Sequence, residues 1–158
     1  VVGLCQQAGV NKNTFYYHFE NIDELAALAA EDLFESQFLC AMVEAISGKA
    51  PLPGCFAENA FREKLDRVCL LAADESSPTL KFMLRDAVAK AWTSAFALAH
   101  DTFDLKEQAS FEFVLGGFLG VLAFRARSGC NFSFEDAVAA SYSSHALDIV
   151  RSLPHRQG

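Results

Sequence analysis

The sequence predicts an all-α protein. Apolar residues recur at spacings of three and four along most of the chain, β-branched runs are few, and turn-forming residues stand between long segments. The chain has 158 residues, of which 52% are hydrophobic, so it can build a real core. These observations indicate one ordinary helical domain, or a small module attached to a larger one.

Capping residues set the order of the first three helices. Gly9 ends a short helix at the start of the chain, and Asn11 can cap a second helix from about 12 to 18. Asn21 can cap a third helix, which carries two acids in its first turn, where the helix dipole favours them. This third helix is expected to run from 22 to about 47.

Four further helices are expected after the segment PLPG. Ser77 with Pro78 marks the start of one, and Asp104 can cap another. Ser133 with Asp136 makes an acidic capping box for the last. The expected helices are about 56–73, 78–100 with room for one break, 105–127, and a final helix that ends near 152.

The boundary that the sequence indicates lies where short opening helices pass into long ones. We therefore expect a module of residues 1–24 and a helical domain of residues 25–158. The net charge is −7, but residues 1–20 carry one basic and one acidic side chain and sum to zero. Acidity gathers behind the module, so the total charge does not by itself decide against a nucleic-acid partner.

Several classes of protein are disfavoured. No apolar run approaches the roughly 18 to 20 residues of a membrane-spanning helix, and no secretory signal opens the chain, so we expect a cytoplasmic protein without a membrane partner. The five cysteines are widely spaced without a C-x-x-C pair, which indicates reduced thiols and no zinc site or other cofactor. The four histidines show no metal spacing, and Ser141 with His145 lacks a third partner, so we predict no enzyme.

The stretch GVNKNTFYYHFEN, residues 9–21, places five rings in succession at positions 15–19. On a helix, Phe15 and Phe19 fall within about 40° of each other and can face a core. The remaining side chains then point outward, and they are donors and stacking surfaces that suit phosphate oxygens and base edges. A short helix, a glycine turn and this polar-faced helix make a helix-turn-helix arrangement, whose second helix enters the major groove of double-stranded DNA.

The stretch AGVNKNTFYYHFENIDEL, residues 8–25, resembles the helix-turn-helix and following helix of the TetR family of bacterial transcriptional repressors. The shared pattern is A-G-V, a small polar cap, T-[LF]-Y, H-F, a short turn, and then an acidic pair with Leu. The resemblance covers only this part of the chain. It implies a partial helix-turn-helix DNA-binding module, followed by a helical domain that binds a small-molecule effector and forms a homodimer.

The resemblance also assigns roles within the module. Positions that hold DNA phosphates in the family are matched by Thr14, Tyr16 and His18. Positions nearest to base edges are matched by Lys12, Asn13 and Tyr17. The tight turn is matched by Gly9, and the small core of the module is matched by Ala8, Val10, Phe15 and Phe19.

Two features depart from the family pattern. Many members have a Lys just before the acidic pair, where it reaches a phosphate; this chain has Ile22, so the anchor is missing or is replaced by backbone N–H groups. The family also begins with a further helix, whereas this chain starts inside the module at Val1. Leu4, Phe15 and Phe19 would be partly unpacked without that helix, which favours its presence in the full protein.

The last two helices are the expected dimer interface. Three glycines inside the 105–127 helix cost roughly 1 kcal/mol each against Ala, so close backbone approach is the expected compensation. Close packing within one subunit is the alternative. The expected interface residues are Phe111, Leu115, Gly116, Phe118, Leu119, Gly120, Leu122, Ala139, Ser143 and Ala146.

An effector pocket is expected among the helices between residues 30 and 125, lined by apolar side chains that suit a hydrophobic or aromatic ligand. Plain core is the alternative for each of them. The candidates are Phe38, Met42, Phe61, Cys69, Phe82, Met83, Trp92, Phe96 and Phe103. We therefore expect a repressor that a small hydrophobic effector releases from DNA. The alternative is a helical interaction protein of the same fold that has lost DNA binding.

Overall fold

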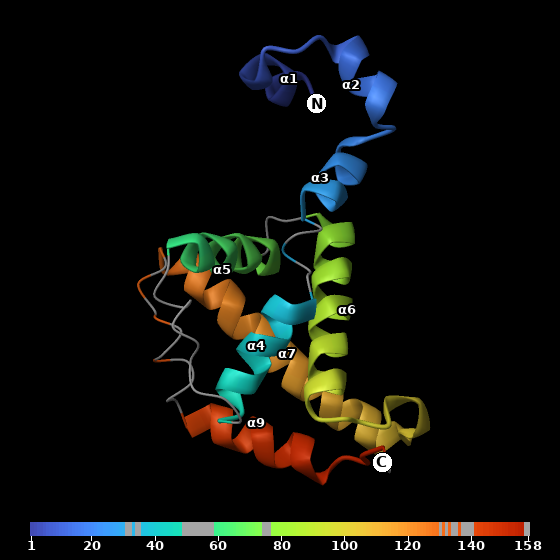
Figure 1. Cartoon of the computed structure of the whole chain (residues 1–158), viewed down its shortest axis with the longest axis vertical. Coiled ribbons are helices and arrows are strands. Elements are labelled where there is room, and N and C mark those ends of the chain that lie inside the picture. Colours follow the sequence, from blue (N-terminus) through green and yellow to red (C-terminus); the bar gives the residue numbers. More distant parts are fainter. Residues whose placement is uncertain are drawn as a thin grey trace. The chain divides into compact units, whose positions relative to one another are not determined.

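The chain is all-α in a computed structural model, as the sequence predicts (Figure 1). The structure describes residues 1–30, 33, 36–48, 59–73, 77–129, 131, 133, 136 and 141–156. These residues contain no strand, and the isolated β-bridge among them joins Leu98 to His155 in antiparallel fashion.

Two compact units make up the chain, unit 1 (residues 1–32) and unit 2 (residues 33–158). Unit 1 contains α1 (Val2–Ala8), α2 (Lys12–His18) and α3 (Ile22–Ala30). Unit 2 contains α4 (Ser36–Ile46), α5 (Asn59–Ala72), α6 (Pro78–Ala95), the 3-10 turn η3 (His100–Thr102), α7 (Leu105–Arg127) and α9 (Ser141–Ser152). The division follows α3, whereas the sequence placed it after residue 24, inside what proves to be one continuous helix.

The helix ends in unit 1 follow the predicted caps. Gly9 has a φ of 67°, the left-handed conformation that suits glycine after a helix, and its N–H donates to the carbonyl of Gln6. Asn11 Oδ1 accepts a hydrogen bond from the N–H of Asn13 at 2.8 Å. Asn21 Oδ1 accepts one from the N–H of Glu24 at 2.9 Å, which caps α3.

The core of unit 1 is small. Cys5 and Phe15 are buried, and the Phe19 ring lies 5.6 Å from the Phe15 ring although Phe19 itself has left the helix. Ala8 and Val10 are exposed, so their predicted core role is wrong. No described helix packs over the side of α1 and its turn on which these two residues lie.

The predicted helix 22–47 corresponds to two helices: α3 ends at Ala30, and α4 begins at Ser36 in the other unit. Leu33 is not α-helical, and residues 31, 32, 34 and 35 lie outside the described residues. No Gly or Pro stands between them, so the sequence pattern gives no sign of the interruption. The two helices differ in burial instead. The described side chains of α3 are all at least partly exposed, whereas α4 buries Leu39, Met42 and Val43.

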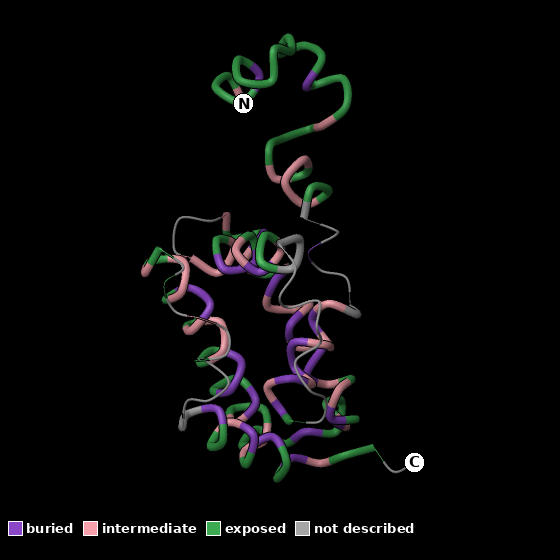
Figure 2. Tube along the Cα trace, turned by 60° about the vertical axis from the view of Figure 1, so that its left-hand side comes forward, coloured by how far each residue is buried: buried purple, intermediate pink, exposed green. Residues whose placement is uncertain are grey.

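Unit 2 is organised around α7, which packs against α5, α6 and α9, while α4 packs against α6 (Figure 1). The buried residues of these helices lie on the sides that face one another (Figure 2). Burial of these apolar side chains is the main stabilising term of the unit. The largest fully buried side chains are Trp92, Phe111, Met42, Leu84, Leu98 and Leu115.

The end of α6 is set by the C-terminal segment. The helix stops at Ala95 rather than near residue 100, and Ala97 has a φ of 50°, which is uncommon for a residue with a Cβ. Two backbone hydrogen bonds hold this turn: Ala99 N–H donates to Pro154 at 2.9 Å, and Arg156 N–H donates to Ala97 at 2.7 Å. The turn is therefore fixed by residues that are distant in sequence.

The predicted caps in unit 2 are partly formed. Ser77 precedes α6 and Pro78 starts it, but the Ser77 hydroxyl makes no cap hydrogen bond. Asp104 and Glu107 form a reciprocal capping box for α7. Ser133 Oγ accepts from the N–H of Asp136 at 3.0 Å, as predicted. The predicted start of the 56–73 helix and residues 137–140 lie outside the described residues.

The helix α7 is long and apolar enough to cross a membrane by length and composition, and 28% of its most apolar window is buried. The expectation that no stretch reaches this length is therefore wrong. Core helices of soluble proteins meet the same criterion, and α7 has packing partners on three other helices. One side of α7 is both apolar and exposed, and it includes Phe113 and Phe124.

Candidate nucleic-acid interface

The helix α2 presents a polar outer face. Phe15 is the buried residue of this helix, at 5% exposure, and fixes which side faces inward. The six predicted DNA-contacting residues are all exposed: Lys12, Asn13, Thr14, Tyr16, Tyr17 and His18. The structure thus exposes every one of them around the buried Phe15, and we call this exposed surface of α2 the α2 face.

The two tyrosines of the α2 face are held differently. The Tyr16 ring meets the Phe15 ring edge-on at 5.2 Å, and the Lys12 ammonium lies 5.7 Å from the Tyr16 ring centroid, within cation–π range. Tyr17 is 86% exposed and meets the His18 ring edge-on at 5.0 Å. Tyr16 is therefore restrained from two sides, while Tyr17 projects furthest and is free to meet a large partner.

The region around Ile22 offers no phosphate anchor. Its side chain is 45% exposed but apolar, and the N–H of Glu24 is already bonded to Asn21. The Glu24 carboxylate accepts a hydrogen bond from the N–H of Glu20 at 2.6 Å. Acidic groups therefore occupy the start of α3, and the backbone N–H groups that could have replaced a lysine are partly used within the chain.

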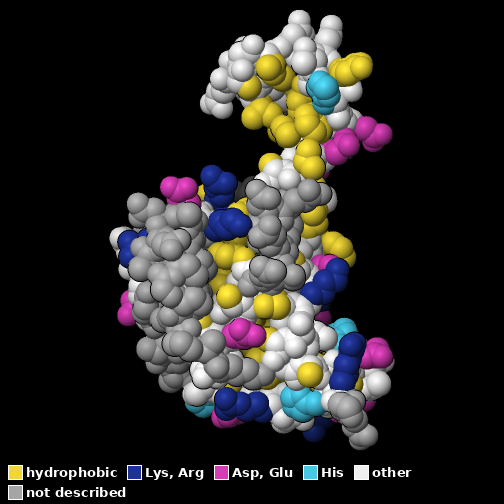
Figure 3. Space-filling view, in the orientation of Figure 1, with side chains coloured by type: hydrophobic (Ala, Val, Ile, Leu, Met, Phe, Trp, Pro, Cys, Tyr) yellow, Lys and Arg dark blue, Asp and Glu magenta, His cyan; other side chains and the backbone are white. Residues whose placement is uncertain are grey.

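Formal charge on the α2 face comes from Lys12 alone. Figure 3 shows acidic side chains beside hydrophobic ones and a histidine on the visible face of unit 1. Phosphate binding by this unit would therefore depend mainly on neutral donors: the hydroxyls of Thr14 and Tyr16, and the His18 ring.

The predicted pocket residues lie mostly in the core of unit 2. Met42, Cys69, Trp92, Phe96 and Phe103 are buried, and Phe38 and Met83 are half-buried. Phe82 is 67% exposed, so its predicted place in an interior pocket is wrong; it lies on the outer side of α6. The side chain of Phe61 lies outside the described residues.

The structure gathers several aromatic residues of unit 2 into two clusters. Trp92 stacks on Phe96 with ring centroids 5.6 Å apart and meets Phe118 edge-on at 6.0 Å. A second cluster joins the rings of His100, Phe103 and Phe111. His100 is exposed, and its ring contacts the rings of Phe103 and Phe111.

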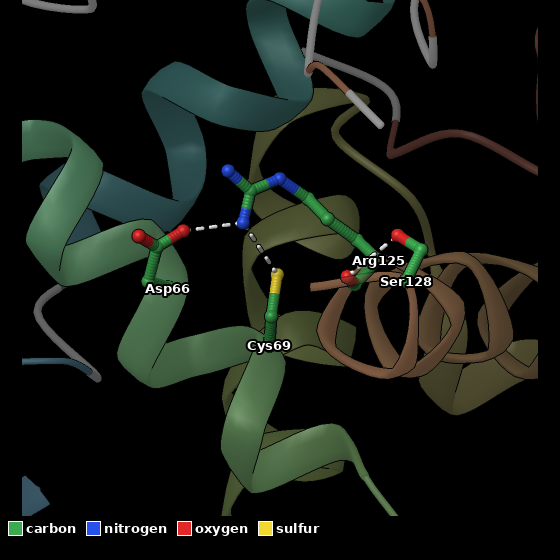
Figure 4. A network of polar contacts seen from close by, with 4 residues as sticks. All are labelled: Asp66, Cys69, Arg125 and Ser128. Atoms are coloured by element: carbon green, nitrogen blue, oxygen red, sulfur yellow. Dashed lines mark hydrogen bonds and ion pairs between the residues drawn. The ribbon is translucent and has the colours of Figure 1, made fainter. Parts of the chain in front are cut away.

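A partly buried polar network that the sequence analysis missed joins α5 to α7 (Figure 4). The Arg125 guanidinium donates to the Asp66 carboxylate and contacts Cys69 Sγ at 3.8 Å. Burial lowers the pKa of Arg125, but the hydrogen bond and the nearby Asp66 and Cys69 outweigh it and raise the pKa above its ordinary value. These residues are far apart in sequence, and no local pattern pairs them.

Several predicted dimer residues are core residues of a single chain. Phe111, Leu115 and Leu122 are at most 4% exposed and Ser143 is 6% exposed, so they have almost no surface left for a second subunit. Phe111, Leu115 and Leu122 lie on the inward side of α7, which the sequence pattern did not distinguish, and Ser143 lies on α9. Of the others, Gly116 and Gly120 are exposed, Phe118, Leu119 and Ala146 are half-buried, and Ala139 lies outside the described residues.

The exposed side of α7 is nevertheless apolar. No atom outside the helix's own backbone lies within 4 Å of a Cβ placed on any of its three glycines. Two phenylalanines that the interface prediction omitted flank these glycines, with exposures of 74% and 52%. We call this surface the α7 glycine face; it consists of Phe113, Gly116, Gly117, Gly120 and Phe124.

No metal site is formed by His, Cys, Asp or Glu side chains in the part of the chain that the structure describes. Comparison with known proteins gives no relative: no protein-family model matches the chain. No curated protein and no solved structure matches it significantly.

Proposed function

We propose that the chain is a DNA-binding transcriptional regulator of the TetR type, acting as a repressor that a small hydrophobic effector releases. The observation that carries this proposal is the α2 face. A glycine turn and an asparagine cap precede a short helix whose one buried ring is Phe15 and whose other six side chains all point to solvent. A helix that served only as core would not expose two tyrosines, a threonine and an asparagine together.

Within this proposal, some side chains of the α2 face contact bases and others contact phosphates. Tyr17 projects furthest and is placed to meet base edges in the major groove, together with Lys12 and Asn13. The hydroxyls of Thr14 and Tyr16, and His18, supply phosphate contacts that fix the position of the helix on the duplex.

The α7 glycine face supports a homodimer. Glycines at 116 and 120 are one helical turn apart and uncovered, so a second helix can approach the backbone closely there. Two exposed phenylalanines beside them would be buried by the same contact, which removes apolar surface from water. A dimer also provides the two recognition helices that a site of two half-sites, roughly 34 to 36 Å apart, requires.

Control by an effector would act on the arrangement of helices in unit 2. A ligand that binds one arrangement more tightly than the other shifts the population by its difference in affinity. The aromatic clusters of unit 2 supply the apolar surroundings that a hydrophobic effector needs.

A second function is favoured by the charge of the module. The α2 face carries a single formal positive charge, Ile22 replaces the usual lysine, and acids occupy the start of α3. These features suit a helical interaction protein that has kept the fold and lost DNA binding. An electrophoretic mobility shift of the full-length protein on its own upstream DNA, at low salt, separates the two functions. A shifted band supports the regulator, and its absence favours the interaction protein.

A further inference from the structure

Besides the Ser77 hydroxyl, two N–H donors inside unit 2 have no acceptor among the described residues. They are the indole N–H of Trp92, whose residue is 1% exposed, and the Nε–H of Arg125, whose side chain is 12% exposed. Both groups donate and cannot accept. A buried donor without an acceptor destabilises the folded state, so native proteins nearly always supply one, from the chain, water or a ligand.

The surroundings of Trp92 are apolar. Its ring lies between the stacked Phe96 ring and the edge-on Phe118 ring, so the indole N–H belongs to an aromatic cluster formed by α6 and α7. A molecule that satisfies this N–H must therefore combine an acceptor atom with an apolar, ring-containing body that matches the cluster.

Arg125, on α7, carries the other of these two N–H donors. Asp66 already pairs with the guanidinium, and Figure 4 shows the remaining nitrogens turned away from Asp66 and Cys69. The unmet requirement is thus an acceptor and not a negative charge. A second carboxylate here would add net charge to a site that is mostly shielded from water, which is unfavourable.

We propose that unit 2 binds an uncharged, ring-containing molecule through a carbonyl oxygen that accepts a hydrogen bond from Trp92 Nε1. If the proposed function is correct, this molecule is the effector, and the proposal then gives its chemical class. Only that identification rests on the proposed function. The binding itself needs no DNA.

The test uses three probes with one ring skeleton: 1-tetralone, its parent hydrocarbon tetralin, and the anion 1,2,3,4-tetrahydro-1-naphthoate. Isothermal titration calorimetry on the whole chain measures each affinity. The ketone is expected to bind about tenfold more tightly than the hydrocarbon, because one neutral hydrogen bond is gained. The anion is expected to bind more weakly than the ketone.

Two variants assign the preference to the indole N–H. Trp92→Phe keeps an aromatic ring and removes the donor, so the ratio of ketone to hydrocarbon affinity is expected to fall close to one. Phe118→Leu keeps the donor and changes the apolar contact, so both affinities are expected to fall together and the ratio to remain. Circular dichroism confirms that each variant is folded.

Three results would overturn the proposal. They are failure of the ketone to bind, equal affinity for ketone and hydrocarbon in the wild-type chain, and an unchanged ratio in the Trp92→Phe variant. The second is the result expected if water already satisfies the N–H. DNA binding measured on the same preparation without probe reports separately on the proposed function, so the two failures are distinguishable.

Discussion

Arg125 on α7 donates a hydrogen bond to Asp66 on α5, and the two residues lie 59 positions apart in sequence (Figure 4). The guanidinium side chain is 12% exposed and its carboxylate partner 42%, so the pair spans the border between core and solvent. It joins α5 to α7, the helix around which unit 2 is organised.

Asp66→Ala is expected to destabilise the chain by about 1 to 3 kcal/mol, because it leaves a shielded guanidinium without its partner. The partial exposure of Asp66 places the effect in the lower part of that range. Urea unfolding followed by circular dichroism measures it. The matched control is Glu112→Ala, which removes the Arg85–Glu112 pair between α6 and α7, where the arginine side chain is 40% exposed instead of 12%. That loss is expected to stay within about 1 kcal/mol, and equal losses would contradict this account.

His155 holds the C-terminal segment against the end of α6. Its Nδ1 lies 2.8 Å from the Phe96 carbonyl oxygen and its Nε2 lies 3.2 Å from the Arg151 carbonyl oxygen. His155→Ala removes both contacts and is expected to cost about 1 kcal/mol in thermal or urea unfolding. Arg156→Ala is the control, because its side chain pairs only distantly with Asp101 at 4.0 Å and both are exposed. If Arg156→Ala lowers the free energy of unfolding more than His155→Ala does, the two His155 contacts do not hold the C-terminal segment.

Gly120→Leu tests the α7 glycine face. The position is open in the single chain, so leucine clashes with nothing there and improves helix propensity by up to about 1 kcal/mol. The monomer is expected to unfold at the same or higher urea concentration. Sedimentation velocity is expected to show a wild-type dimer and a dissociated variant, because the added side chain separates the two helices.

Lys90→Leu is the control for Gly120→Leu, since Lys90 is an exposed residue on α6 outside the glycine face. It adds a leucine to the surface and is expected to leave the dimer intact. A Gly120→Leu variant that sediments like the wild-type chain would exclude this face as the interface.

Tyr17→Ala and Thr14→Ala are expected to affect DNA binding in different ways. Tyr17 is assigned to base edges, so its loss is expected to reduce the preference for one sequence over another. Thr14 is assigned to phosphates, so its loss is expected to weaken binding to all sequences alike. Both side chains are exposed, so neither change removes core contacts. Anisotropy titrations against two duplexes measure both affinities, and an equal loss of preference would show that the assignment is wrong.

Much of the local structure could be predicted from the sequence, because caps and turns depend on nearby residues. Gly9, Asn11, Asn21 and Asp104 end or begin helices where their side chains and backbone predict. The exposed side of α2 was likewise predictable, since five successive rings cannot all face one core.

What the sequence could not show depends on contacts between distant residues. The interruption between α3 and α4 has no Gly or Pro to mark it, and the turn after α6 is fixed by backbone bonds to Pro154 and Arg156. On α7, apolar residues occur on both sides, so periodicity did not distinguish the buried Phe111 from the exposed Phe113. The Arg125–Asp66 pair could not be predicted either, because the two residues are 59 positions apart in sequence.

We propose that the α2 face binds a specific DNA sequence, and fluorescence anisotropy measures that binding. The full-length protein is titrated at low salt onto duplexes that tile its own upstream region and onto a scrambled duplex of equal composition. One tiled duplex is expected to bind at least about tenfold more tightly than the scrambled one, and Asn13→Ala with Tyr17→Ala is expected to abolish that difference. Equal affinity for every duplex, or no binding to any, would contradict the claim.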